Sequence, residues 1–486
     1  MTSTEKVPGS GPARTADAGA RTPARGVRRD VVAALAGVAL FAAAAVAGAA
    51  LNRTTYHGSG ILRLSSPPLY GPWLPHVGPG TLAAPVVAAL VVAYGPPLAR
   101  RLSWRRLLPA AWAATAVWTF ALAMVDGWGR GYAQRLTTRM EYLRSVPAVH
   151  DIPATLADFT HHILVGSPHI WPAHVSGHPP GALLTFVLLD RVGLGGGAWA
   201  ATWCLLTGTS AVAAVLVAVR ALCGEVWARR AAPFLVLIPA AVWIGVSADG
   251  YFAGVAAWTV ALLALSATRT ARWPRLAALA AGLLAGLAGY LSYGLTVLVV
   301  MVAAVLVMTR TVRPLPYLVL GALPWVLAFT AAGFWWPEGY TTLHTRYYQG
   351  AAKVRPYGYF VWADLAAQVP SVGLAALAGL RRAAGPLREG VRRCAAAWPW
   401  RRDAATAARP VTGRAALAGL VAAAVCMMLA ADLSGMSKAE TERIWLPFAV
   451  WLPVACALLP RASHRWWLAV QATVALLVNS LLFTGW

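Results

Sequence analysis

The feature that most limits the fold of this chain is a series of apolar segments, each about as long as a bilayer is thick and almost free of charge. A helix needs about 20 apolar residues to cross the hydrocarbon core of a membrane. Of the 486 residues, 59% are hydrophobic and only 12% are charged. The sequence therefore predicts an all-α integral membrane protein and excludes a soluble globular core.

We expect about thirteen transmembrane helices from these segments. The apolar residues 182–192 are too few to cross and end at Asp190-Arg191, so we expect them to form an interfacial helix on the outer surface. The predicted spans lie near residues 31–51, 82–98, 107–125, 198–219, 231–248, 251–268, 276–291, 294–308, 316–335, 361–380, 415–433, 444–460 and 466–484.

The basic residues orient these segments. The formal net charge is +24, but 29 of the 41 lysines and arginines fall on pieces that become cytoplasmic when the N-terminus is inside. This is the positive-inside asymmetry of a multi-pass plasma-membrane protein, and it accounts for the charge without nucleic acid as a partner. The bilayer is the partner that this pattern implies.

The segments divide the chain into five parts. The first helix ends in Ala47-Gly48-Ala49-Ala50, which resembles a signal-peptidase site, but its long basic lead favours a retained anchor. The predicted parts are a disordered basic cytoplasmic tail at 1–30, two transmembrane helices at 31–106, a module at 107–335 with an external loop at 126–197, a second external loop at 336–360, and C-terminal helices at 361–486 with a basic cytoplasmic loop at 381–414.

The polar stretch 126–181 is the most informative part of the sequence for function. Asp126 directly follows an apolar helix, and the run His178-Pro179-Pro180-Gly181 closes the stretch, which holds six of the ten histidines. An anion at a helix C-terminus faces the negative end of the helix dipole, so Asp126 is not a helix cap. We interpret it as a candidate general base.

This order of features resembles the GT-C membrane glycosyltransferases, particularly the branch with protein O-mannosyltransferases and bacterial aminoarabinose transferases. The resemblance covers a seven-helix module at 107–335, with Asp126 as the catalytic base and Asp249 as a second external acid. It implies a polyprenyl-phosphate-linked sugar as donor, an envelope glycan or lipid as acceptor, and transfer with inversion. Where many relatives carry a second acid, Asp126 is followed by Gly127, so the involvement of a divalent cation stays open.

Other polar residues are candidates for binding, each with a plainer alternative. Asp249 could cap the helix that follows it, and His178 could satisfy a local hydrogen bond. Cations among tyrosines suit a lipid phosphate at the membrane surface, although an aromatic belt looks the same. The donor-phosphate candidates are Lys353, Arg355, Arg443 and Arg346, and the further substrate-binding candidates are His178, Arg130, Glu141, Tyr347, Tyr348 and Tyr357.

A transporter or flippase of lipid-linked sugars is the alternative function. It would need polar or broken helices across the membrane, whereas the ionisable residues of this chain gather in the external loops. The spacing of His161, His162, His169 and His174 fits no metal motif, so we expect surface histidines. Gly282 and Gly286 predict the close packing of two helices.

Overall fold

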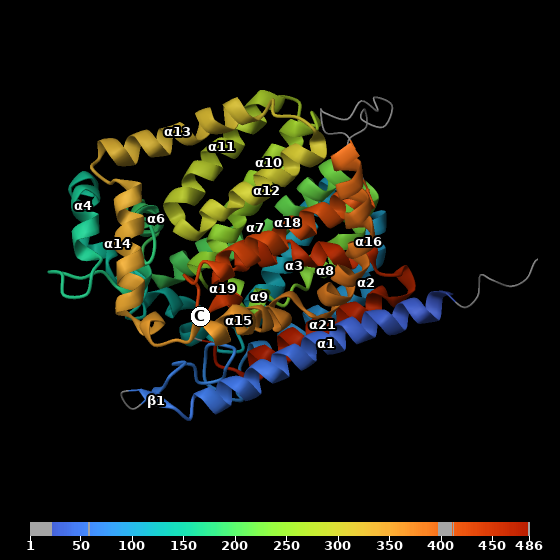
Figure 1. The fold of residues 1–486 in the computed structure, drawn as a ribbon, viewed down its shortest axis with the longest axis horizontal. Helices are drawn as coiled ribbons and strands as arrows, with labels where there is room; N and C mark the ends of the chain where they lie inside the picture. Colours follow the sequence, from blue (N-terminus) through green and yellow to red (C-terminus); the bar gives the residue numbers. More distant parts are fainter. Residues whose placement is uncertain (1–21, 57–58, 397–410, 412, 485–486) are drawn as a thin grey trace, which may run out of the picture.

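The computed structural model describes residues 22–56, 59–396, 411 and 413–484 (Figure 1). The described part is helical except for loops and a two-residue antiparallel hairpin, in which Thr55–Tyr56 (β1) pairs with Ser59–Gly60 (β2). The tail residues 1–21 and the loop residues 397–410 lie outside the described residues.

The described residues contain seven helices that are long and apolar enough to cross a membrane, and up to ten if each of three sharply bent helix pairs counts as one span. The protein is therefore an all-α multi-pass membrane protein. The seven are α1 (Thr22–Leu51), α2 (Gly80–Arg101), α3 (Trp104–Ala123), α7 (Gly197–Cys223), α10 (Ala248–Ala267), α11 (Pro274–Leu291) and α18 (Arg414–Leu433).

Helix α1 begins at Thr22, so the prediction of a disordered tail is wrong for residues 22–30. Asp30 explains the extension of the helix. Its carboxylate is fully buried between Arg381 and Arg382, with Arg382 Nη2 at 2.6 Å. These two arginines lie on α16 (Leu374–Ala396), which also makes the first part of the predicted loop 381–414 helical.

The predicted span 231–248 is wrong as a single helix. Its residues form α8 (Glu225–Val236) and α9 (Ala241–Ile244), separated at Pro239, which cannot donate a backbone hydrogen bond. Gln471 of α21 (His464–Leu481) donates from Nε2 to the carbonyls of Phe234 and Leu237 at 2.8 and 3.1 Å. A distant side chain thus satisfies the carbonyls that the break frees, which lets irregular backbone exist inside the bundle.

Three other predicted spans are interrupted. The span 444–460 consists of α19 (Thr441–Ile444), α20 (Leu446–Ala449) and a 3₁₀ segment, Leu452–Leu458, with prolines at 447 and 453. The span 361–380 bends by 109° at Gly373, between α15 (Tyr357–Val372) and α16. The span 294–308 begins with a 3₁₀ segment, Tyr293–Leu298, before α12 (Val299–Thr309).

Helices α11 and α13 (Leu315–Ala331) pack closely, as the two glycines predicted. A Cβ at Gly282 would lie 2.0 Å from the carbonyl oxygen of Leu318 and 2.9 Å from the Cα of Gly321. A Cβ at Gly286 would lie 2.6 Å from Trp325. Larger residues at these positions would force the helices apart.

The polar stretch folds into short helices at one end of the bundle. They are α4 (Ile152–Asp158), α5 (Ala173–Ser176) and α6 (Gly181–Arg191), and 3₁₀ and π turns occupy residues 129–148. Figure 1 shows α4, α6 and α14 (Trp336–Gln349) together at the left, whereas α16 lies toward the right. The eleven residues of α6 are a separate helix, as predicted.

Candidate functional site

Asp126 lies three residues beyond the end of α3, and only 7% of its side chain is exposed. His76 Nε2 lies 2.7 Å from its Oδ1, and Arg135 Nη2 donates to its Oδ2 at 3.1 Å. A half-exposed arginine, Arg130, lies 3.8 Å from Oδ1. The two guanidinium groups place positive charge beside the carboxylate and so offset its unfavourable position at the helix end.

Two segments far apart in the sequence hold this group in place. The loop before α2 pairs through its main chain with the last residues of α21 and the chain just after them, and His76 N donates to the carbonyl of Ser480 at 2.9 Å. Arg135 donates to the carbonyl of Thr484 at 2.8 Å. The ring of Phe483 lies 4.4 Å from the Arg130 guanidinium and 5.2 Å from that of Arg135. The segment after α21 therefore completes the surroundings of Asp126.

Asp249 forms a second buried ion pair, with Arg443 of α19. The side chains are 5% and 6% exposed, and Arg443 also donates to Glu440 Oε2 at 3.1 Å. The interpretation of Asp249 as a helix cap is wrong, because Ser247 caps α10: its Oγ accepts from the backbone N–H of Gly250 at 3.2 Å.

Glu141 and Tyr142 bring α5 and the chain before α6 into the same region. Glu141 Oε1 lies 2.9 Å from His174 Nδ1, and the Tyr142 hydroxyl lies 2.9 Å from His178 Nδ1. His174 is buried, so the prediction of a surface histidine is wrong at this position. The reason is tertiary: the N–H of His174 donates to the carbonyl of Met140, which docks α5 beside Glu141.

The plainer alternative for His178 is also realised, since its Nδ1 lies 2.7 Å from the carbonyl oxygen of His174. Burial lowers the pKa of His178, and the nearby Asp249 opposes this change. The imidazole is therefore neutral near pH 7. It is suited to hydrogen bonding, and it is a weak proton donor.

Acidic and basic side chains alternate through the region. The charge on Arg135 interacts with both Asp126 and Glu141, and the charge on Arg443 interacts with both Asp249 and Glu141. We call Asp126, Arg135, Glu141, Arg443 and Asp249 the five-charge cluster. All five are buried or nearly so.

The electrostatics of the cluster favour charged forms. Burial raises the pKa of Glu141, but His174 and Arg443 lower it, and the net change is a decrease. Burial lowers the pKa of Arg443, but Asp249, Glu440 and Glu141 raise it above its ordinary value. Glu141 and Arg443 are thus ionised at neutral pH and are held in position by their partners before any substrate arrives.

Glu442 is a buried carboxyl of a different kind. It is fully buried, and its Oε1 accepts from the backbone N–H of Tyr70 at 2.8 Å. Among the described residues, its Oε2 has no hydrogen-bond partner. Burial is the main cause that raises its pKa to about 7. The sequence offered no signal that Tyr70 and Glu442 would meet.

The cations in and around the loop 336–360 bind main-chain carbonyls of the protein itself. Arg355 is 8% exposed and donates to the carbonyls of Leu62, Lys438 and Arg63 at 3.0, 2.7 and 3.5 Å. Lys438 Nζ donates to the carbonyls of Ala352 and Arg355. A phosphate at Arg355 would have to displace these carbonyls.

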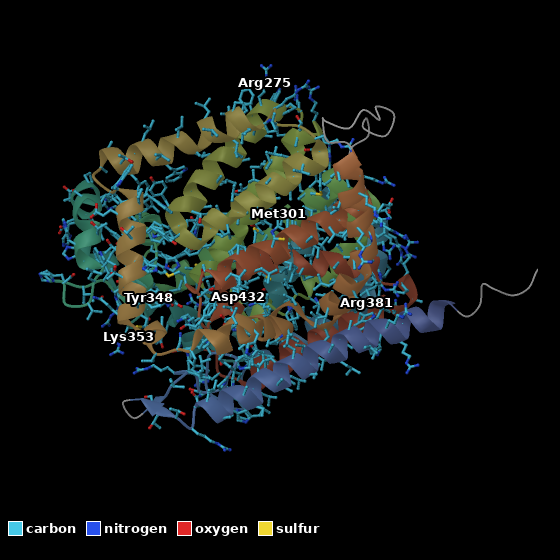
Figure 2. The ribbon with its side chains drawn as sticks, viewed as in Figure 1. Arg275, Met301, Tyr348, Lys353, Arg381 and Asp432 are labelled. Atoms are coloured by element: carbon cyan, nitrogen blue, oxygen red, sulfur yellow. The ribbon has the colours of Figure 1, made fainter. Side chains whose placement is uncertain are left out.

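The remaining candidates of this loop differ in exposure. Tyr347 accepts from the N–H of Lys438 at 2.7 Å, and Tyr357 donates to the carbonyl of Leu433 at 3.3 Å. Lys353 is exposed and Arg346 is half-buried. Figure 2 shows Tyr348 and Lys353 at the left end of the molecule, the end that holds α14.

The structure brings together Asp126 with Arg130, and Asp249 with Arg443, and it places Glu141 and His178 beside the second pair. It does not bring Arg355 into the cluster. Sequence reasoning missed His76, Arg135, Tyr142 and His174. His76 lies before α2, outside the module 107–335 that the resemblance covers, so only its histidine type could have marked it.

The part of the chain that the structure describes holds no group of three or more histidine, cysteine, aspartate or glutamate side chains able to bind a metal. Two arginines adjoin Asp126, which is a poor environment for a divalent cation. No protein-family model matches the chain, and no curated protein matches it.

Proposed function

We propose that the protein is a membrane glycosyltransferase that moves a sugar from a polyprenyl-phosphate carrier to a hydroxyl of an envelope glycan or lipid. The five-charge cluster carries this proposal. Its carboxylates and guanidinium groups are buried at the ends of apolar helices, where a lipid-linked substrate and a polar acceptor can meet. The resemblance of the motif order supplies the reaction class.

In this mechanism Asp126 acts as the general base. The acceptor hydroxyl gives its proton to the carboxylate while its oxygen attacks the anomeric carbon from the face opposite the leaving group. The bond between the anomeric carbon and the phosphate oxygen breaks, and the lipid phosphate leaves as an anion. Arg443 is the best-placed cation to stabilise the growing phosphate charge, because its position is fixed by Asp249 and Glu440.

His76 and Arg135 are positioning residues in this mechanism. Both contact Asp126 and both are held by the chain at 480–484. They fix the direction in which the carboxylate faces the acceptor.

The topology belongs to the same proposal: about thirteen membrane-embedded segments, an N-terminus in the cytoplasm, and the cluster at the external face of the plasma membrane. The distribution of basic residues supports it. Single cysteines at the exposed positions Thr138 and Gln349 should react with an impermeant thiol reagent in intact cells. A cysteine at Thr270 should react only after lysis, and the reverse pattern would invert the topology.

A transporter of lipid-linked sugars is the second candidate, and the interrupted segments 225–244 and 441–458 favour it. However, at the first interruption the freed carbonyls are bound by Gln471, and the segment from Phe234 to Ile244 is buried throughout. The acids of the cluster lie at helix ends, Asp126 just beyond α3 and Asp249 in the first turn of α10. We therefore favour the transferase.

An assay with purified protein tests the proposal. The protein is incubated with labelled polyprenyl-phosphate pentoses or hexoses and an envelope extract, and sugar transfer is measured per folded protein. Asp126→Asn should lower the rate by about 10²–10⁴-fold, the usual loss for a general base. The matched control is Asp158→Asn, an exposed carboxylate of the same polar stretch, which should leave the rate unchanged.

Two outcomes would overturn the assignment. If Asp126→Asn turns over at the wild-type rate, Asp126 is not the base. If no lipid-linked donor gives any transfer, the protein is not a transferase of this kind. Liposomes with a fluorescent lipid-linked sugar and no acceptor distinguish the alternative, because a transporter moves the lipid between leaflets under these conditions.

A further inference from the structure

A second charged region lies away from the five-charge cluster. It is a groove of about 1150 Å³ between the turn that joins α10 to α11 and the turn that joins α12 to α13. Five arginines line it, and none of its lining residues is acidic: Arg269, Arg272, Arg275, Arg310 and Arg313. We call this region the arginine groove. In Figure 2, Arg275 points away from the ribbon at the top of the molecule.

Within the described residues, four of the five arginines of this groove lack the counter-charges that other arginines have. Arg229 pairs with Glu225, and Arg381 pairs with Asp30. Within the described residues, Arg269, Arg272, Arg275 and Arg313 form no ion pair with a carboxylate. Like charges gathered in one concavity repel each other, so an anion in the groove would relieve the repulsion.

The backbone adds a second observation. Arg269 and Arg310 follow the ends of α10 and α12 with φ of +56° and +52°, in the left-handed region where glycine is the usual residue. Arginine in this conformation is disfavoured, because its Cβ comes too close to the following carbonyl oxygen. Its occurrence at two neighbouring turns brings two more guanidinium groups to the groove.

The helix dipoles give a third observation that favours an anion in the groove. The groove is also lined by Pro274 and Pro314, at the N-terminal ends of α11 and α13. A helix N-terminus favours an anion and disfavours a cation. Arg275 in the first turn of α11 and Arg313 just before α13 are therefore unfavourably placed unless a negative group lies between them and the helix ends.

Aromatic rings orient two of the guanidinium groups. Arg272 lies 4.8 Å from the ring centre of Trp273, and Arg275 lies 5.9 Å from that of Tyr317. Stacking occupies the face of a guanidinium and leaves its N–H edge free, which is the edge that binds phosphate oxygens in pairs.

We propose that the arginine groove binds the phosphate headgroup of a membrane lipid that carries at least two negative charges. The groove lies at the ends of apolar helices, and Leu276 and Leu315 beside the arginines are 55% and 40% exposed, which suits an acyl chain. The four arginines without a carboxylate partner among the described residues exceed the single charge of one phosphodiester. The proposal does not depend on the transferase activity.

The test measures lipid retained by the purified full-length protein in native mass spectrometry. The probes are phosphatidic acid, phosphatidylglycerol and phosphatidylcholine with the same acyl chains, and inorganic phosphate is a separate arm. Wild-type protein should retain phosphatidic acid above the other two lipids. Arg272→Ala/Arg275→Ala should reduce its retention by at least tenfold, since each lost charge-assisted contact weakens binding by about this factor.

Arg105→Ala/Arg106→Ala is the matched control, because it removes the same charge from two exposed arginines at the start of α3. It should retain phosphatidic acid as the wild type does. Equal losses in both double variants, or equal retention of all three lipids, would overturn the proposal. Full displacement of phosphatidic acid by equimolar inorganic phosphate would assign the groove to a soluble phosphate and would also overturn it. Both variants are exposed substitutions, and an unchanged Tm confirms that each is folded.

Discussion

Two regions at one end of the molecule bury cations in different ways. In the five-charge cluster, Arg135 and Arg443 face carboxylates on other elements. In the region of the loop 336–360, Arg355 and Lys438 face main-chain carbonyls. An anionic group of a substrate can replace a carboxylate as the partner of a cation. A main-chain carbonyl mainly holds one segment of the chain against another. The first region is therefore suited to chemistry and the second to holding loops together.

The comparison also applies to the carboxyl groups. Asp249 faces a guanidinium and is part of the cluster. Glu442 faces the N–H of Tyr70, and burial raises its pKa. An opposite charge beside a buried acid favours its charged form, whereas burial that one backbone N–H does not fully offset favours its neutral form. Each of the following variants tests one side of this difference.

The largest effect is expected at the Asp249–Arg443 pair. Arg443→Gln leaves the buried Asp249 carboxylate without its partner, and breaking a buried pair typically costs about 3–5 kcal/mol. The double variant Asp249→Asn/Arg443→Gln removes both charges and should regain a large part of this loss. Thermal unfolding in detergent, followed by tryptophan fluorescence, measures both. A double variant that is destabilised by the sum of the two single effects would show that the pair does not interact as described.

The next effect depends on pH and concerns Glu442. Its pKa in the folded protein is about 7, above the ordinary value of 4.5, so the folded state holds a proton that the unfolded state has lost between these values. Its contribution to stability is therefore present below pH 4.5 and is lost as pH rises to about 7. Glu442→Gln stays neutral and keeps an acceptor for Tyr70.

Glu442→Gln should match the wild type at pH 5 and exceed its stability at pH 8 by up to about 3 kcal/mol. The measurement is the difference in Tm between the two proteins from pH 5 to pH 8. A constant difference across this range would mean that Glu442 does not change its protonation. The comparison between the two kinds of buried carboxyl would then fail.

Arg355→Ala tests the cations that bind carbonyls. It leaves the carbonyls of Leu62 and Lys438 without their donor, and such a loss costs about 1–3 kcal/mol for a buried group. We expect a lower Tm and an unchanged KM for the lipid-linked donor per folded protein. The control is Lys353→Ala, which removes an exposed cation of the same loop and should change neither value. A raised donor KM at wild-type stability would return Arg355 to the donor site.

The sequence predicted the class of the fold and the position of the two acids at helix ends, because both depend on local patterns. Apolar length identifies helices that cross a membrane, and Asp126 and Asp249 each stand at the end of such a helix. The partners of these acids could not be predicted in the same way. His76 reaches Asp126 through a loop that pairs with residues 480–482, and Arg443 reaches Asp249 across 194 positions. These contacts depend on tertiary packing alone.

The loop 336–360 also shows that residue types alone do not establish a site. Its cations and tyrosines fit a phosphate site by residue type, but residue type does not say which way a guanidinium points. The interrupted segment at Pro239 was missed for a related reason. Apolar length is continuous through the break, and the side chain that satisfies its carbonyls is Gln471, on a helix more than 200 residues away.

The smallest effect separates two arginines on one carboxylate. Arg135 is 7% exposed and donates to Asp126 at 3.1 Å, whereas Arg130 is 52% exposed and lies 3.8 Å away, against the ring of Phe483. Water screens the Arg130 charge, so Arg130→Ala should cost only about 0.5–1 kcal/mol. Arg135→Ala should cost several times more, because it leaves Asp126 buried beside one less cation. Thermal unfolding at low and high salt distinguishes the two: added salt should reduce the Arg130 effect and leave the Arg135 effect almost unchanged. Equal costs with equal salt dependence would mean that burial does not decide how these charges act, and the contrast between the two regions would lose its physical basis.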